Sequence, residues 1–342
     1  MLKKYSALAE RESITQSVSN MPQIVDLELT IPAEMRGLRL DQALADLLRD
    51  YSRSRLQQWI RAGEVTLDGR VPRVRERLQG GESVCIHAEI VEQTASKPEP
   101  IALDLVYEDA SLLVVNKPAG LVVHPAAGNP AGTLLNALLH FDARLAGLPR
   151  AGIVHRLDKS TSGLMVVART LKAHKKLVDA LQARDVKREY LAVVNTVLTA
   201  GGRVEAPIGR HPVDRKRMAV VGGGREAITH YRVEERYRAH TLTRISLETG
   251  RTHQIRVHMA HVHSPVVGDP VYGGRLRLPR GASDALKEVL QGFKRQALHA
   301  TRLALLHPES EEMISWQADV PEDMAQLIKA LQDDVSAHKD DA

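Results

Sequence analysis

The sequence contains a single cysteine, Cys85, among its 342 residues. One thiol cannot form an internal disulfide, and it cannot supply a metal site built from several cysteines. A reducing compartment is the expected setting. The first residues contain no apolar run typical of a secretory signal peptide, and no uninterrupted apolar stretch approaches the roughly 18 residues of a membrane span. We therefore expect a cytoplasmic protein without a membrane segment.

Aromatic residues are also scarce, at 3% of the chain. A protein that binds single-stranded nucleic acid mainly by base stacking would need more of them. The charge balance is basic, with 47 Lys and Arg against 42 Asp and Glu and a formal net charge of +5. This balance is compatible with a nucleic-acid partner but does not require one. If RNA is the partner, charge and shape should dominate its recognition.

The length favours two folded units, and changes in composition indicate where they begin and end. A polar, unpatterned segment opens the chain and is expected to be disordered; either Met1 or Met21 is the start. A polar stretch containing proline separates a small basic unit from a larger apolar one. The predicted divisions are a tail at 1–22, the small unit at 37–90, a linker at 91–100, the large domain at 101–335 and a polar tail at 336–342.

The small unit is predicted to fold as two helices followed by short strands. Leu40, Leu44 and Leu47 recur at helical spacing, and either Ser52 or Ser54 can cap a second helix. An Asp-Gly hairpin signal follows. Arginines are concentrated around the second helix and the hairpin, where they could pair with phosphate or simply form a solvated surface. The candidate RNA-binding residues here are Arg53, Arg55, Arg61, Arg70 and Arg73.

In the large domain, apolar runs typical of strands dominate, at 112–115, 121–123, 163–167, 190–194, 228–233 and 242–247. Helical patterns interrupt them at 133–141, 171–185 and 321–335. Helices and strands do not alternate strictly, as they would in a doubly wound sheet. The pattern predicts the α+β class, with a large mixed or mainly antiparallel sheet and flanking helices.

The most informative segment runs from His155 to Gly163, with the sequence HRLDKSTSG between two apolar runs. Such a loop would present the carboxylate of Asp158 at the edge of a sheet. Arg156 and Lys159 flank it, and opposite charge nearby stabilises an ionised carboxylate. From the spacing alone, a functional site and an ordinary surface ion pair are about equally good interpretations.

This segment resembles the HRLD signature of the RluA family of pseudouridine synthases, and further segments resemble that family's other motifs in the same order. These segments are Leu113–Pro118, Lys187–Tyr190, Gly250–His258 and Leu298–Ala300. Residues 37–90 resemble the S4 RNA-binding module that many members carry. The resemblance implies the pseudouridine synthase fold and the isomerisation of uridine to pseudouridine in RNA, without a cofactor or a metal.

The same resemblance implies roles for individual residues. Asp158 would be the essential carboxylate; whether it attacks the ribose, attacks the uracil or abstracts a ribose proton stays open. Arg256 would pair with it, facing the cleft from a predicted strand. Tyr190 would stack on the base and move a proton, although a half-buried strand tyrosine is the alternative. Arg156 would contact phosphate or take the place of the flipped base. Lys117 and Leu298 would belong to the pocket or be structural.

Within the family, the likeness is greatest to members that modify the helix 69 stem-loop of 23S ribosomal RNA. It is carried by residues 210–212, 218–220, 271–275 and 295–300, and Ser162 is a departure because a second Thr is common there. The implied partner is 23S ribosomal RNA or a precursor of the 50S particle, whose assembly the protein would support, and we expect a monomer. Further candidate RNA-binding residues lie near the glycine-rich loop at 222–227, although a solvated loop is an equally good interpretation: Arg210, Arg215, Lys216 and Arg217.

Other classes fit less well. His253, His258, His261 and His263 do not match the spacing of a zinc-binding helix. The match of 222–227 to a dinucleotide-binding loop precedes a strand-like run where a helix is needed. The remaining rival is a non-catalytic RNA-binding or ribosome-assembly factor, which would not need a carboxylate where anionic RNA docks.

Overall fold

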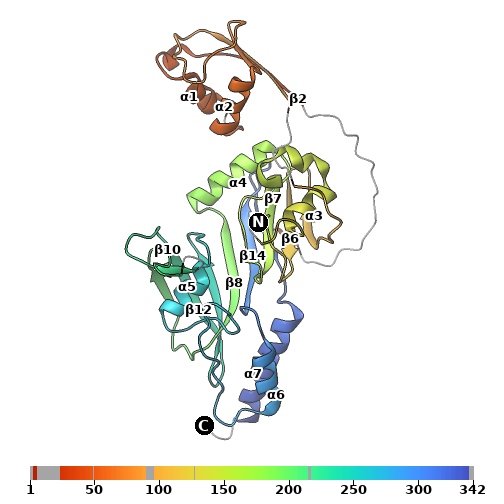
Figure 1. The fold of residues 1–342 in the computed structure, drawn as a ribbon, viewed down its shortest axis with the longest axis vertical. Helices are drawn as coiled ribbons and strands as arrows, with labels where there is room; N and C mark the ends of the chain where they lie inside the picture. The colour runs from red at the N-terminus through yellow and green to blue at the C-terminus, as the bar shows by residue number, and fades with distance from the viewer. Residues whose placement is uncertain are drawn as a thin grey trace.

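The computed structural model describes residues 3–5, 24–48, 50–89, 96–126, 128–214 and 217–338. Within these residues, a ten-stranded sheet forms the centre of the larger domain (Figure 1). Its main path runs through β5 (Leu105–Glu108), β6 (Leu112–Lys117), β7 (Ser162–Ala168), β14 (Leu298–Leu306), β8 (Lys187–Val194), β13 (Thr241–Leu247), β12 (Ile228–Arg236) and β9 (Gly202–Glu205). Neighbours on this path are antiparallel except β7 and β14, which confirms the predicted α+β class.

Two more strands extend this sheet beside β14. β15 (Met313–Gln317) pairs antiparallel with β14, and β1 (Lys3–Tyr5) pairs in parallel with β15. A part of the segment expected to be a disordered tail therefore forms a strand. The rest of residues 1–22, including Met21, lies outside the described residues, as do residues 91–95 of the predicted linker.

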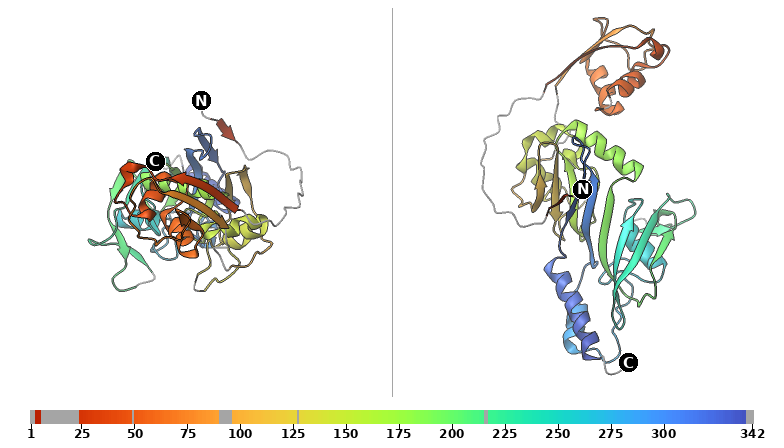
Figure 2. Two further views of the ribbon diagram at one scale, coloured as in Figure 1. Left: turned by 90° about the horizontal axis from the view of Figure 1, so that it is seen from above. Right: turned by 180° about the vertical axis from the view of Figure 1, so that it is seen from behind.

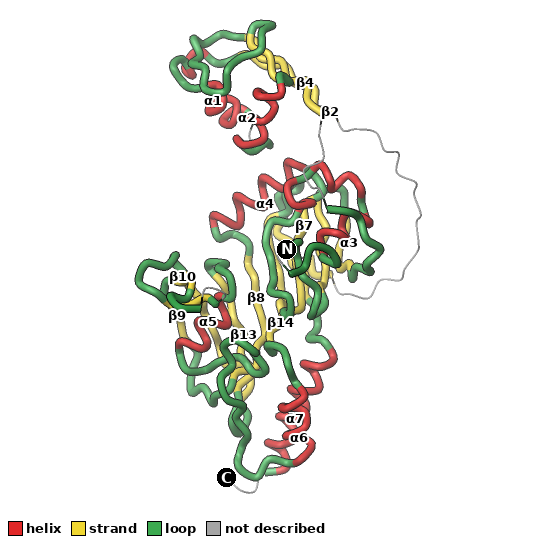
Figure 3. Tube along the Cα trace, in the orientation of Figure 1, coloured by secondary structure: helices red, strands yellow, loops and turns green. Residues whose placement is uncertain are grey.

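Helices flank the sheet (Figure 3). They are α3 (Leu134–Phe141), α4 (Leu171–Ala183), α5 (Gln254–His261), α6 (Asp284–Gly292) and α7 (Glu322–Ala337), with 3-10 turns at Ala143–Gly147 and Pro149–Gly152. α3, α4 and α7 confirm the predicted helices, and α7 continues two residues into the expected polar tail, of which residues 339–342 are not described. Thr133 and Thr170 cap α3 and α4. None of the helices described is long and apolar enough to cross a membrane.

Both faces of the central strands are buried, which explains their uninterrupted apolar runs. Leu113 and Val115 of β6 join a cluster that includes α3, α6 and α7. Leu112 and Val114, which alternate with them, pack in a second cluster with α4. The two clusters hold the sheet between helical layers, so the loops at its edges have rigid support.

The predicted strand at 121–123 is not formed. Val122 makes only an isolated bridge with Thr133. Its carbonyl oxygen instead accepts a hydrogen bond from Leu134 N–H, and Val123 O accepts one from Leu135 N–H, at 2.8 and 3.2 Å. The apolar run is short, and its carbonyl oxygens accept hydrogen bonds from N–H groups at the start of α3 that have no partner within the helix.

The small N-terminal unit lies at one end of the molecule and α6 and α7 at the other (Figures 1 and 2). It contains α1 (Leu40–Leu47), α2 (Arg53–Ala62), a 3-10 turn at Ala33–Met35 and a sheet of β2 (Ile24–Thr30), β4 (Ser83–Glu89) and β3 (Val65–Leu67). The predicted order holds from α1 through α2 to β3 and β4, but β2 precedes both helices and was not predicted. Ser52 caps α2. Because β2 pairs along β4, the unit begins at residue 24, earlier than expected.

Candidate active site

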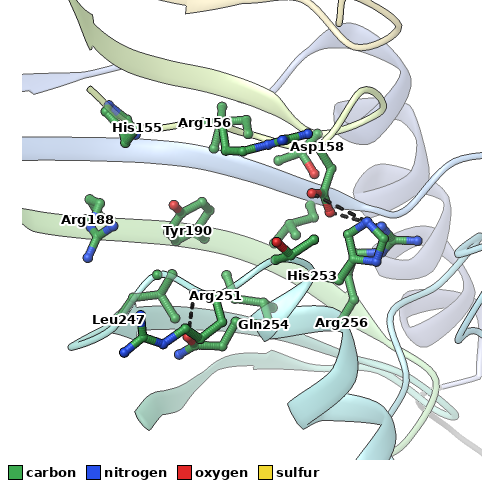
Figure 4. A pocket seen from close by; sticks show the side chains of 16 residues that line it. His155, Arg156, Asp158, Arg188, Tyr190, Leu247, Arg251, His253, Gln254 and Arg256 are labelled. Atoms are coloured by element: carbon green, nitrogen blue, oxygen red, sulfur yellow. Dashed lines mark hydrogen bonds and ion pairs between the residues drawn. The ribbon is translucent and has the colours of Figure 1, made fainter. Parts of the chain in front are cut away.

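A pocket of about 120 Å³ lies at the centre of the large sheet, between the 155–158 loop and the segment that leads into α5. Figure 4 shows Asp158, Tyr190 and Arg256 around it. These residues come from the loop before β7, from β8 and from α5, and Leu298 of β14 completes the wall. The structure thus brings together predicted site residues that lie up to 140 positions apart in the chain.

The loop that carries Asp158 is held by its backbone. Thr161 N–H donates to Asp158 O at 3.0 Å, and Gly120 N–H donates to Lys159 O at 2.8 Å. Gly163 follows with φ 115°, and a Cβ there would lie 2.3 Å from the carbonyl oxygen of Ala300. A left-handed backbone and this close approach both require glycine. The loop therefore has little freedom to move Asp158.

Arg256 connects Asp158 to a buried second carboxylate. Its Nη1 donates to Asp158 Oδ2 at 2.9 Å, while Nε and Nη2 donate to the two oxygens of Asp269 at 2.7 and 2.9 Å. Asp269 also accepts from the backbone N–H groups of Val271 and Tyr272. The guanidinium is thus fixed by a bidentate pair on one side and presents one N–H to Asp158 on the other.

Burial and ion pairing shift the pKa values of Arg256 and Asp269 in opposite directions. Burial alone would lower the pKa of Arg256, but Asp269 and Asp158 raise it above its usual value. Burial would raise the pKa of Asp269, yet hydrogen bonds from Arg256 and from two backbone N–H groups hold that pKa below its ordinary range. Both groups stay charged, so Asp158 always faces a positive charge.

The position of Arg256 differs from the prediction in its secondary structure. Residues 254–258 were predicted as a strand, but they begin helix α5, after His253 in a left-handed conformation with φ 57°. Every residue from Gln254 to Met259 is buried. A segment surrounded by protein on all sides lacks the one-sided pattern that separates a helix from a strand.

Tyr190 and Leu298 both lie in the pocket wall and are nearly inaccessible, at 6% and 3% exposure. Burial raises the pKa of the Tyr190 phenol, with Arg188 opposing and Asp158 reinforcing the change. The phenol is therefore protonated at neutral pH. Arg156 is exposed at the rim of the same pocket.

Lys117 stands behind the pocket instead of lining it. The side chain is 1% exposed, and Nζ donates to the carbonyl oxygens of Pro118, Leu121 and Lys159 at 2.8, 2.9 and 3.1 Å. Burial lowers its pKa to about 7, partly opposed by Asp158. Three carbonyl acceptors match the three protons of an ammonium group. Of the two roles weighed for Lys117, this geometry favours the structural one, an anchor for the Asp158 loop.

Lys117→Met is expected to lower the free energy of unfolding by about 1–3 kcal/mol, because buried carbonyls lose their donor. Above pH 7 the unfolded chain binds a proton on Lys117 that the folded chain releases, up to the ordinary pKa of lysine. The stability of the wild type relative to the variant should therefore rise with pH, by at most about 1.4 kcal/mol per pH unit. Urea unfolding of both proteins from about pH 6.5 to 9.5 measures this difference; a difference independent of pH would contradict it.

Two side chains near Asp158 were missed by the sequence analysis. Asp269 stands in a Gly-Asp-Pro turn, a local signal for a turn but not for an ion pair with Arg256. His253 was weighed only as a metal ligand. Its Nε2 lies 3.8 Å from Asp158 Oδ1, and its Nδ1 is hydrogen-bonded to Tyr272 Oη at 2.9 Å.

The predicted RNA-binding residues of the small unit have different surroundings. Arg61 and Arg73 are exposed, and Arg70 is exposed but paired with Glu76. Arg53 binds the buried carboxylate of Asp41. Arg55 does not fit the prediction: it is 5% exposed, and its Nη2 donates to Gly147 O in the large domain at 2.9 Å.

The predicted RNA-binding residues between positions 210 and 217 also have different surroundings. Arg210 is exposed at the end of β10 (Ile208–Arg210), which forms a hairpin with β11 (Met218–Val220). Arg217 lies over the ring of Tyr272, 5.3 Å from its centroid, and so contacts the surroundings of the pocket. Arg215 and Lys216 lie outside the described residues.

Comparison with known proteins identifies the family to which this chain belongs. Residues 111–261 match the family model described as RNA pseudouridylate synthase, and residues 38–84 match the S4 domain. The chain is 57% identical over 307 residues to "Ribosomal large subunit pseudouridine synthase D" of Xanthomonas campestris, covering 90% of this chain and 93% of the relative. It is 54% identical over 322 residues to the protein of the same name in Escherichia coli K12, covering 94% and 99%. This chain is an RluA-family pseudouridine synthase.

A solved structure agrees with this assignment of the synthase. The chain resembles human RNA Pseudouridylate Synthase Domain Containing 4 with a TM-score of 0.53 and 25% identity, over 67% of this chain and 92% of that one. The pseudouridine synthase fold and the N-terminal S4 module expected from the motifs are therefore confirmed. The choice between an enzyme and a non-catalytic assembly factor is decided in favour of an enzyme.

Proposed function

We propose that this synthase converts uridine to pseudouridine in large-subunit ribosomal RNA, in the helix 69 stem-loop of 23S RNA, with Asp158 as the catalytic carboxylate. The name of its relatives supports the choice of large-subunit RNA. The observation that supports Asp158 most directly is its hydrogen bond to Arg256 inside the pocket, at 2.9 Å. The expected partner is free 23S RNA or a 50S precursor. We expect the synthase itself to be a cytoplasmic monomer.

The reaction rearranges one nucleotide without adding or removing atoms. The bond between N1 of uracil and C1′ breaks, the base turns, and C5 bonds to C1′; the proton on C5 leaves and N1 gains one. The target base must leave its stack to enter a pocket, which costs a few kcal/mol and least in a loop. This requirement favours a hairpin loop as the substrate.

The pocket residues suit these steps. Asp158, oriented by Arg256, can act on the ribose or the uracil as nucleophile or base. Tyr190 offers a ring to the base and, because burial raises its pKa, a protonated phenol for proton transfer. Arg156, exposed at the rim, can take the place that the flipped base leaves or bind phosphate.

RNA outside the pocket would meet the basic surface of the S4 unit. Arg61 and Arg73 are the predicted contacts that remain well exposed, with Arg70 beside them. Arg210 and Arg217, at the β10–β11 hairpin of the large domain, would add separate contacts nearer the pocket. Arginine pairs with phosphate in a planar, bidentate geometry, so these contacts would fix the position of the RNA without reading its sequence.

Mapping of pseudouridine in 23S RNA tests the proposal. Cells lacking the synthase are expected to lose pseudouridine in the helix 69 loop, and wild type but not Asp158→Asn should restore it. Persistence of these sites with loss of others would refute helix 69 and leave the enzyme class intact. Restoration by Asp158→Asn would refute the role of the carboxylate.

A further inference from the structure

A second cavity, of about 400 Å³, adjoins the pocket that holds Asp158. It lies between α4, the start of β8 and the 248–251 turn, and it has no part in the chemistry described above. The two cavities share His155, Arg188, Gly250 and Arg251 in their walls. Figure 4 shows Arg188 on the side of Tyr190 away from Asp158. A nucleotide whose base fills the first pocket would therefore have its neighbour beside the second.

Arginines dominate the charged groups of this second cavity. Arg184 is neutralised, since it pairs with Glu226 at 2.7 Å and with Glu248 at 3.4 Å. Arg251 uses Nε to donate to the backbone oxygen of Glu226 at 2.8 Å. Burial, together with repulsion from Arg225 and Arg184, lowers its pKa. The cavity thus carries more positive charge than its acidic partners compensate.

Arg188 is the least satisfied of these side chains. Its Nε is buried and has no hydrogen-bond partner among the described residues. Its Nη1 passes close to Gly250, since a Cβ there would lie 2.8 Å from that nitrogen. A buried N–H without an acceptor costs free energy unless a ligand supplies one. The Arg188 side chain makes no hydrogen bond or ion pair with the described residues, and it lies in the wall that the two cavities share.

We propose that the second cavity binds the phosphate of a nucleotide adjacent to the target uridine, through Arg188 and Arg251. Guanidinium groups match phosphate oxygens in shape and charge. Val154, Val178 and Leu181 form an apolar part of the wall, suited to the ribose of that nucleotide. A volume of about 400 Å³ lies within the roughly 300–1,000 Å³ of ligand sites. The proposal rests on the proposed activity toward uridine in RNA and assigns a separate subsite.

The test is a double-mutant cycle between protein and RNA. The substrate is the 23S hairpin in which pseudouridine mapping locates a site, prepared with normal linkages or with an uncharged methylphosphonate on either side of the target. Arg188→Gln should raise KM for normal RNA about 10–100-fold, because a hydrogen bond to a charged group is lost. On RNA with one of the two linkages neutralised, the same substitution should change KM less than about twofold, since the phosphate partner is already absent.

Arg232→Gln is the matched control. Arg232 lies on β12 on the opposite face of the sheet, with 73% of its side chain exposed, and it carries the same charge. It should weaken binding slightly and equally on all the RNAs. Arg251→Gln provides a second variant, expected to couple to the same linkage, if Arg188→Gln folds poorly.

Multiplicative effects of Arg188→Gln and both neutral linkages would overturn the subsite. So would a fall in kcat alone on all RNAs, which would mean that Arg188 only positions Tyr190. Dissociation constants of the protein–RNA complexes can replace KM in the same double-mutant cycle. An inactive wild type would refute the proposed function, while the coupling of Arg188 to one phosphate would still be measured.

Discussion

Asp158→Asn is expected to lower the rate of pseudouridine formation by at least about 10⁴-fold, the upper range for loss of a group that takes part directly in bond making. Asparagine has nearly the same size, and Arg256 keeps both of its bonds to Asp269. The pocket should therefore keep its shape. Release of tritium from RNA labelled at C5 of uridine measures the rate, because C5 exchanges its hydrogen for the bond to C1′.

The affinity of Asp158→Asn for RNA should equal that of the wild type or exceed it slightly. The substitution removes a negative charge from a surface that meets phosphates. Asp333→Asn, an exposed position on α7 with 65% of its side chain accessible, makes the same change of charge without effect on either quantity. If Asp158→Asn lost binding and turnover to the same extent, the aspartate would serve the structure of the RNA site and not the chemistry.

Arg256→Met is expected to lower the free energy of unfolding by about 3–5 kcal/mol, in addition to abolishing activity. The Asp269 side chain is 0% exposed, and without Arg256 the hydrogen bonds it keeps within the described part of the chain come from two backbone N–H groups. The cost is that of an uncompensated buried charge. Urea unfolding measures it, and the tritium assay measures the activity.

The double variant Arg256→Met/Asp269→Asn separates these effects. The side-chain amide introduced by Asp269→Asn carries no charge, and its carbonyl oxygen can still accept the backbone N–H groups. The double variant should therefore be more stable than Arg256→Met. It should remain inactive, because Asp158 has lost its partner. Equal stability of the single and the double variant would show that the charge of Asp269 is not the source of the loss.

Local signals in the sequence predicted much of the fold. Thr133 and Thr170 precede helical patterns, and each caps the helix that was expected. The apolar runs at 112–115 and 163–167 became β6 and β7. These features depend on neighbours within a few residues, so they can be recognised before the tertiary structure is known.

The candidate site was predicted in part. Asp158, Tyr190 and Arg256 were named together because their motifs resemble one family, and the structure brings them to one pocket. The expected strand at Arg256 is wrong, because residues buried on all sides show neither the helical nor the strand spacing of apolar residues clearly. Arg55 was predicted to bind RNA, but an exposed arginine and one that contacts another domain look alike in a sequence.

The sequence by itself determined where α3, α4 and α7 begin, that the apolar runs at 112–115 and 163–167 form strands, and which side chains are candidates for the chemistry. Only the tertiary structure decided that Asp269 holds Arg256, that Lys117 supports the Asp158 loop from behind, and that Arg188 joins two cavities. The physical reason is the separation along the chain of the residues that interact. Caps and apolar periodicity act within a turn or a strand, whereas an ion pair or a cavity depends on distant segments packing side by side.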